Sequence, residues 1–243
     1  MAQKTDLNIS PYYDDYSESK DFHKVLYRAG RPLQARELTQ SQSLLQNQIE
    51  KFGDHFFEEG SIVTGAQSDV DFDLYYVKVL ASNPNSSGDS AVESYRESYH
   101  DKYLVGKTSG VVAKVINSDA ETSTDYITLY IRLERQGTDA DNSFAFSGDE
   151  VLAPCGFNSD GDVTEDTSNN NHFKVAPQSV TPVGRTSIAN IAEGVVYIRG
   201  FFVRVPAQQL VLEKYNAKPS YRVGLTITES FISTAEDSSL YDN

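Results

Sequence analysis

The hydrophobic positions between residues 31 and 60, "RPLQARELTQSQSLLQNQIEKFGDHFFEEG", recur with a helical period. Steps of seven, four, three and four residues separate Leu38, Leu45, Ile49, Phe52 and Phe56, and this spacing is typical of a coiled-coil seam. Pro32 suits the first turn of a helix, and Gly60 suits the position just past its end. The sequence therefore predicts a coiled-coil-like helix of about 27 residues, roughly 40 Å long.

This seam needs a surface to pack against. Burying a Leu, Ile or Phe side chain stabilises a protein by roughly 1.5 to 3 kcal/mol relative to exposing it. The seam packs either on β-strands of the same chain or on like helices of other copies or a related subunit. Gln42 favours the second interpretation, because a single polar residue in a seam selects register and oligomeric state. The predicted assembly interface is Leu38, Gln42, Leu45, Ile49, Phe52 and Phe56.

Outside this stretch, the pattern predicts an extended arm and a series of strands. Residues 1–30 are polar and tyrosine-rich, with one short helix expected at 17–27. Segments rich in β-branched and aromatic residues follow Gly60, and the short strands of residues 100–155 suit a small barrel or sandwich. A polar loop is expected at 156–171. Strand patterns then resume in "EGVVYIRGFFVRVPAQQLVLEKY" and "SYRVGLTITESFIS", which we expect to pair with the strands just after the helix.

The expected fold class is α+β: an extended N-terminal arm and a long coiled-coil-like helix, followed by a β-sandwich or barrel domain that carries a small all-β insert. Residues 1–60 form the arm and helix, which is the assembly region. Residues 61–99 and 172–243 form the β domain. Residues 100–171 form the inserted β domain with its polar loop.

Composition narrows the function classes. The 243 residues include one cysteine, which excludes an internal disulfide framework, and carry 21 basic against 35 acidic groups, a formal charge of −14. This charge disfavours binding to nucleic acid. No apolar run reaches 18 residues and the N-terminus lacks the apolar centre of an export signal, so we expect no membrane insertion and assembly in a cytoplasm.

Two acidic clusters suggest calcium sites, but a simpler interpretation is favoured for each. Asp69, Asp71 and Asp73 alternate with apolar residues as in a half-buried strand, and Leu74 and Leu80 stand where a calcium loop needs Gly and an acidic residue. The second cluster reads as a solvated turn; it consists of Asn158, Asp160 and Asp162. We therefore predict no metal site.

No enzyme site can be named from the sequence. The four histidines lack metal-ligand spacing, Cys155 has no histidine near it in sequence, and phosphate-binding loops and nucleophile elbows are absent. A glycosidase site is not excluded, since its two carboxylates need not be close in sequence. We predict no enzyme activity, no catalytic residue and no cofactor.

Residues 11–63, "PYYDDYSESKDFHKVLYRAGRPLQARELTQSQSLLQNQIEKFGDHFFEEGSIV", resemble the N-terminal region of a family of structural tail proteins from tailed phages, especially phages of cyanobacteria. A Pro-Tyr-aromatic arm, the stretch from Phe22 to Gly30, "QARELTQ" and "LQNQIE" carry the resemblance. "EGVVYIRGFFVRV" and "YRVGLTITESFIS" are similar to a second block of that family. Members are longer, so the resemblance implies the N-terminal part of a longer subunit.

The resemblance implies a virion protein of the baseplate or the tail-fibre attachment region, without catalytic residues. Its partners would be other tail or baseplate subunits and copies of itself, with a trimer favoured. The alternative function is the N-terminal anchoring part of a glycan-binding or glycan-degrading tail spike.

Overall fold

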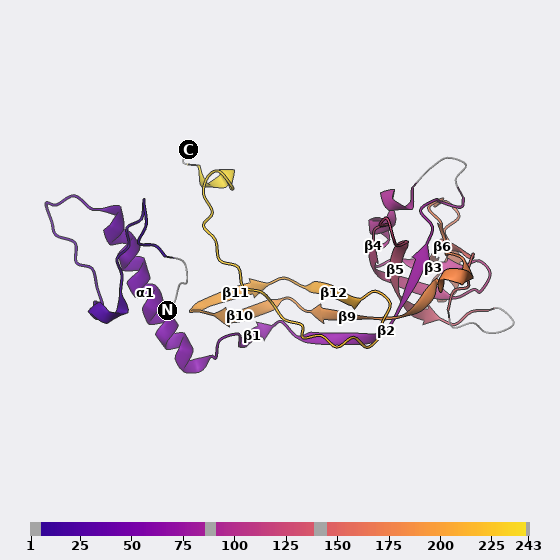
Figure 1. Cartoon of the computed structure of the whole chain (residues 1–243), viewed down its shortest axis with the longest axis horizontal. Helices are drawn as coiled ribbons and strands as arrows, with labels where there is room; N and C mark the ends of the chain where they lie inside the picture. The colour runs from indigo at the N-terminus through magenta and orange to yellow at the C-terminus, as the bar shows by residue number, and fades with distance from the viewer. Residues whose placement is uncertain (1–5, 86–90, 139–144, 242–243) are drawn as a thin grey trace. The chain divides into compact units, whose positions relative to one another are not determined.

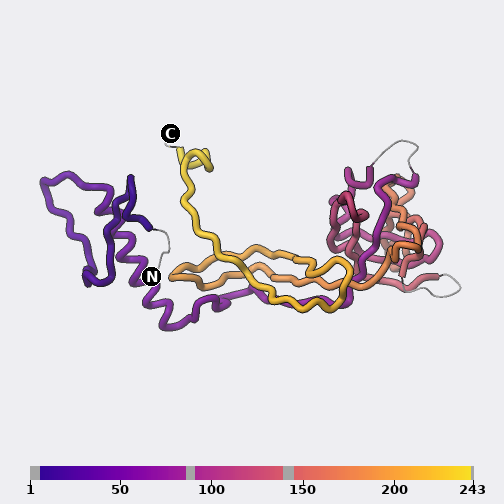
Figure 2. The backbone as a smooth tube through the Cα atoms, viewed as in Figure 1, coloured from indigo at the N-terminus to yellow at the C-terminus, as the bar shows by residue number. Residues whose placement is uncertain are grey.

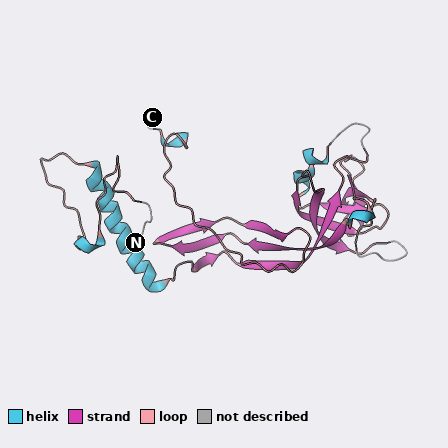
Figure 3. Cartoon of the chain, in the orientation of Figure 1, coloured by secondary structure: helices cyan, strands magenta, loops and turns pink. Residues whose placement is uncertain are grey.

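Antiparallel β-strands are the main regular secondary structure in the computed structural model, which describes residues 6–85, 91–138 and 145–241 (Figures 1 and 3). The chain divides into two compact units. The first consists of Met1–Ser68, Ile191–Gln208 and Val223–Asn243. The second consists of Asp69–Asn190 and Gln209–Arg222.

A nine-stranded sheet builds the second unit, with strands in the order β12-β9-β2-β5-β4-β3-β6-β7 and β8 paired to β6. The strands are β2 (Ser68–Val79), β3 (Tyr103–Gly106), β4 (Val112–Asp119), β5 (Ile127–Arg135), β6 (Val151–Phe157), β7 (Val163–Glu165), β8 (Phe173–Lys174), β9 (Val183–Ile191) and β12 (Gln208–Glu213). Three short 3-10 helices accompany them: η2 (Val92–Ser94), η3 (Arg96–Tyr99) and η4 (Gln178–Val180).

Part of this sheet closes on itself. An antiparallel bridge joins Val79 to Val175, and Leu80 N–H donates to the Lys174 carbonyl at 2.8 Å, so the chain after β8 pairs with the end of β2. Closure lets alternate side chains of β2, β5, β4, β3, β6 and β8 share one interior. Among the residues that fill it are Val77, Leu104, Leu129, Ile131, Leu152 and Phe173, all at 0–1% exposure.

The first unit has little interior of its own. It contains the 3-10 helices η1 (Glu18–Lys20) and η5 (Ser238–Leu240), the helix α1 (Ala35–Phe56), and a three-stranded sheet in the order β1-β10-β11. The strands are β1 (Ile62–Gly65), β10 (Gly194–Ile198) and β11 (Phe201–Val205). Among the described residues, its hydrophobic core cluster has three buried members, Ala66, Val196 and Val205, with Ile191 and Ile198 packed against them.

The prediction of a long coiled-coil-like helix is wrong. α1 spans 22 residues, and it is the one α-helix among the described residues. It begins after Gln34, whose N–H donates to the Glu37 carboxylate at 3.2 Å, and not at Pro32. It ends at Phe56, and the next residue, Phe57, has an extended backbone and a ring that packs against Tyr197 and Phe202, with centroids 5.4 and 5.8 Å away. Tertiary packing thus ends the helix before Gly60.

The α+β class is corrected for the same reason: the protein is mainly β, with two antiparallel sheets and a single α-helix in its described part. The short helix expected at 17–27 is reduced to η1. β10 pairs with β1, the first strand after the helix. The strand expected in residues 220–233 is absent, and Figure 2 shows this part as an extended trace after β12.

A two-residue turn brings the β10–β11 hairpin close to α1. Arg199 and Gly200 connect the paired residues Ile198 and Phe201 with φ of 48° and 80°, which matches a type I′ hairpin turn. A Cβ at Gly200 would lie 2.9 Å from the Glu50 Cβ, and Gln46 Nε2 donates to the Gly200 carbonyl at 3.0 Å. The glycine therefore serves both the turn and the contact with α1.

Gly200→Ala should loosen this contact. Alanine is strained at the positive φ of this position, and its methyl group would also lie too close to Glu50 of α1. We therefore expect a loss of about 1 to 3 kcal/mol in the free energy of unfolding of the first unit. Hydrogen exchange of the α1 amides measures it. Gly156→Ala is the control, because nothing lies within 4 Å of a Cβ there. Equal exchange in both variants would contradict the prediction.

Candidate assembly site

The helix α1 is buried on its polar face and exposed on its apolar face. Its buried residues are Leu44, Asn47, Glu50 and Gly53. Two of these four residues are polar, Asn47 and Glu50, and the seam lies on another side of the helix. In a typical surface helix of a globular protein, the apolar face packs on the core and the polar face is exposed.

The N-terminal arm covers part of the buried face through polar contacts. Asp14 is 5% exposed and accepts a hydrogen bond from the Ser43 hydroxyl. Gln40 Nε2 donates to Asp15 at 3.1 Å, and the Lys51 ammonium lies 2.6 Å from the Glu18 carboxylate. Ion pairing with Lys51 keeps the pKa of Glu18 below its usual value. The arm therefore contacts polar side chains of α1, of which Lys51 remains 53% exposed.

The β10–β11 hairpin covers the rest of the buried face. The Tyr197 side chain is fully buried, and its hydroxyl lies 3.0 Å from the Glu50 carbonyl and 2.9 Å from the Asp54 carboxylate. Burial, followed by the hydrogen bond to Asp54, raises the pKa of Tyr197 to about 12. Gly53 has no side chain and so lets the Tyr197 ring lie against the helix. The orientation of α1 is thus determined by close polar contacts.

The predicted seam remains open to solvent as a consequence. Leu38 and Ile49 are each 48% exposed, Leu45 and Phe56 are each 64% exposed, and Phe52 is 70% exposed. Gln42 is exposed beside them. The Phe52 and Phe56 rings contact each other at 5.0 Å between centroids. The structure therefore brings the six predicted residues together on one helix face, and its five apolar side chains are largely exposed among the described residues.

Exposed apolar side chains concentrate in the first unit. Among the described residues, the second unit exposes six large hydrophobic side chains: Val70, Phe72, Phe157, Leu210, Tyr215 and Tyr221. All the other exposed large hydrophobic residues lie in the first unit, on the arm, α1, β1, β11 and the C-terminal segment. Large apolar patches on a folded unit mark sites of protein association. Most of the exposed large hydrophobic side chains among the described residues lie in the first unit.

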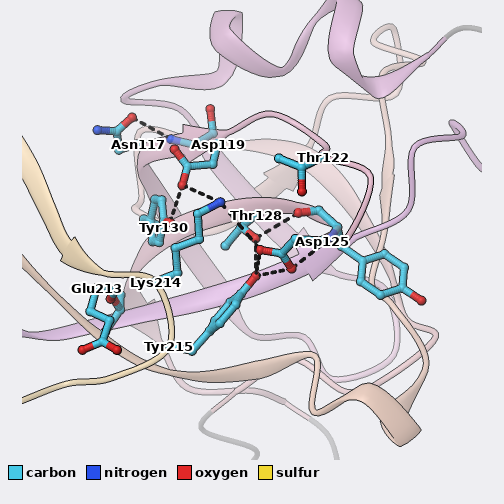
Figure 4. Close-up of polar contacts among 12 residues, drawn as sticks. Asn117, Asp119, Thr122, Asp125, Thr128, Tyr130, Glu213, Lys214 and Tyr215 are labelled. Carbon is cyan, nitrogen blue, oxygen red and sulfur yellow. Dashed lines mark hydrogen bonds and ion pairs between the residues drawn. The ribbon is translucent and has the colours of Figure 1, made fainter.

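A cluster of polar side chains in the second unit, shown in Figure 4, anchors the chain after β12. The Lys214 ammonium lies 3.0 Å from Asp119 and 3.6 Å from Asp125. The Tyr215 hydroxyl is 2.5 Å from an Asp125 carboxylate oxygen, and the Tyr130 hydroxyl donates to Asp119 at 2.7 Å. Burial, together with these carboxylates, raises the pKa of both tyrosines, so both hydroxyls stay protonated donors. The two carboxylates serve as structural acceptors.

Tyr215→Phe tests this anchor. It keeps the ring, which packs edge-on against Tyr76 at 4.7 Å, and removes the hydroxyl that bonds Asp125. We expect the free energy of unfolding of the second unit to fall by about 1 kcal/mol, because Tyr215 is partly exposed and Asp125 keeps Lys214 as a partner. Urea denaturation followed by near-ultraviolet circular dichroism measures it. Tyr221→Phe, at a position 63% exposed, is the control and should change nothing.

The candidate metal and nucleophile positions have structural explanations. Asp69, Asp71 and Asp73 lie on β2, where Arg132 pairs with Asp71 and Arg185 lies 3.5 Å from Asp73. Asn158 accepts the N–H groups of Asp160 and Asp162 at 3.0 and 2.7 Å, as in a turn. Within residues 6–85, 91–138 and 145–241, no three His, Cys, Asp or Glu side chains gather where they could hold a metal ion.

The surroundings of Cys155 and His172 favour a structural role for both side chains. Burial raises the pKa of the half-buried Cys155 thiol to about 11, and the Glu165 charge adds to this, so the reactive thiolate is scarce at neutral pH. His172 is 4% exposed, and burial lowers its pKa, so the ring is neutral. Its Nε2 lies 3.9 Å from Glu165, beyond hydrogen-bond distance.

Comparison with known proteins links the chain to an uncharacterised domain family over part of its length. A family model described as a domain of unknown function (DUF4815) matches residues 10–88, which include α1, β1 and β2. No curated protein and no solved structure matches the chain. No helix within the described ranges is long and apolar enough to cross a membrane.

Proposed function

We propose that this chain is a structural subunit of a phage tail, in the baseplate or the tail-fibre attachment region, and that it assembles with copies of itself and with other tail proteins through its first unit. The exposed apolar face of α1 carries the proposal. The resemblance of residues 11–63 to phage tail proteins supports the placement in a virion.

The energetics of the seam favour association. Its five apolar side chains are 48–70% exposed, and each gains roughly 1 to 2 kcal/mol if a partner covers it. Part of this gain offsets the loss of translational and rotational freedom on association. The contacts with the arm and the hairpin already orient the helix, so little further ordering is needed. Since α1 is the one α-helix among the described residues, a like helix that covers this face would come from another subunit.

The glycan-directed alternative receives no support from the site geometry. A glycosidase needs one carboxylic acid and one carboxylate that act on a bound sugar. The clustered carboxylates Asp119 and Asp125 are instead engaged by Lys214, Tyr130 and Tyr215. We therefore favour the structural function.

The mass of residues 1–243 in solution tests self-association. Light scattering over a concentration series should give a stable multiple of 27.0 kDa, with three times that value expected for the trimer. A mass of 27.0 kDa at every concentration would contradict self-association and leave a different tail protein as the partner.

A further inference from the structure

Residues 221–231, which belong to the first unit from Val223 onward, have the pattern of a β-strand and no strand partner. Tyr221, Val223, Leu225 and Ile227 alternate with Arg222, Gly224, Thr226 and Thr228. A period of two places such apolar side chains on one face of a strand. In the structure this segment forms no strand, and the four apolar side chains are 46–63% exposed.

A sheet edge that could receive a strand lies in the same unit. β11 is an end strand of the three-stranded sheet, and the other end strand is β1. Phe201, Phe202 and Val203 on β11 are 40–55% exposed. An exposed apolar end strand presents unpaired N–H and C=O groups to any strand that can align with it. A three-stranded sheet with three core residues is also marginal without further packing.

The segment already lies next to this edge without pairing to it. Leu225 to Glu229 line a groove of about 550 Å³ together with Phe201, Val203 and Val205 of β11. The Arg199 guanidinium, at the hairpin turn, lies 3.2 Å from the Glu229 carboxylate. The groove is mainly apolar, so the segment and the edge have matching surfaces. In a single chain they meet only through side chains.

We propose that residues 221–231 of one copy form a β-strand on the β11 edge of a second copy. This inference rests on the self-association proposed above and specifies a contact through which two copies bind each other. Every copy carries both the segment and the edge, so each copy gives one strand and receives one, and such a head-to-tail exchange forms a ring, such as a trimer, when the rotation between copies closes. Backbone hydrogen bonds provide affinity, and the apolar face of the segment covers the exposed β11 side chains.

Two adjacent proline substitutions, Thr226→Pro and Ile227→Pro, test the strand. Neighbouring residues of a strand direct their N–H groups toward opposite edges, so only one of the two prolines can remove a ladder bond. We expect that one variant raises the dissociation constant of the assembly by about tenfold or more relative to its alanine control, and that the other does not. The controls are Thr226→Ala and Ile227→Ala, and light scattering on dilution measures all four.

Disulfide trapping identifies the second copy. In a Cys155→Ser background, chains carrying Phe201→Cys or Val203→Cys are mixed with chains carrying Leu225→Cys or Ile227→Cys, and the mixture is oxidised. The proposal predicts disulfide-linked pairs of unlike chains for at least one combination, because pairing brings residues of two strands within disulfide distance. Phe157→Cys mixed with Ile227→Cys is the control and should not link.

The outcomes separate this inference from the proposed function. If the chain has a multiple mass but neither proline exceeds its alanine control and no unlike chains link, the strand exchange is wrong and self-association stands. If a chain with both cysteines links only within itself, the segment pairs with its own β11 and the exchange is also wrong. A chain that stays monomeric contradicts the strand exchange and self-association, and leaves assembly with a different tail protein.

Discussion

Leu45→Asp is expected to leave the chain folded and to prevent its self-association. Leu45 is 64% exposed at the centre of the seam, so a carboxylate there meets water in the monomer and lowers its stability by less than about 1 kcal/mol. In an assembly the same carboxylate would be buried in an apolar contact without a partner. We expect the dissociation constant to rise by about 100-fold or more.

The measurement is the mass by light scattering on dilution, with thermal unfolding to show that the fold is intact. Gln48→Asp is the matched control, since it places the same group on an exposed position of α1 outside the seam. It should assemble as the unchanged protein does. Intact assembly of Leu45→Asp would contradict the interface, and loss of assembly in both variants would show that added charge alone is responsible.

The second large effect is expected in the core of the second unit. Phe173→Ala should lower the free energy of unfolding of the second unit by about 3 to 5 kcal/mol, because it leaves a cavity in a closed interior. The ring is fully buried, and it packs edge-on against Tyr95 and Tyr99 with centroids 5.3 and 4.9 Å away. This loss is a large part of the stability of a typical domain.

Urea denaturation measures this loss, and Phe157→Ala is its control. Phe157 lies on β6 and is 40% exposed, so the same truncation should cost only about 1 kcal/mol. The core of the second unit is complete within one chain, so the measured loss should not depend on protein concentration. Equal losses in both variants would show that Phe173 is not part of the core.

The sequence predicts burial better in the second unit than in the first. In the second unit, apolar residues in strand-like segments predict the elements, and burial in a closed sheet follows from the same residues. In the first unit, apolar residues mark surfaces that stay exposed. Asn47, Glu50 and Gly53 form the buried face of α1, and nothing in their chemistry predicts this.

The parts of the candidate site differ in the same way. The seam was predicted from its spacing, and the structure adds that it is open. The anchor of Lys214 and Tyr215 on Asp119 and Asp125 was missed, because these residues are about 90 positions apart and carry no local signal. The turn at Arg199 and Gly200 was also missed, although a glycine between two strand-like runs is a hairpin signal.

The sequence by itself determined the periodicities: a helical one around residues 38–56 and a strand-like one over most of the rest. Local sterics and the alternation of side chains produce these patterns without distant contacts. Only the tertiary structure decided where α1 ends, which of its faces is buried, and that residues 221–231 remain without a partner strand. Those outcomes depend on Phe57, Tyr197 and Asp14, and on which strand edges a single chain can reach.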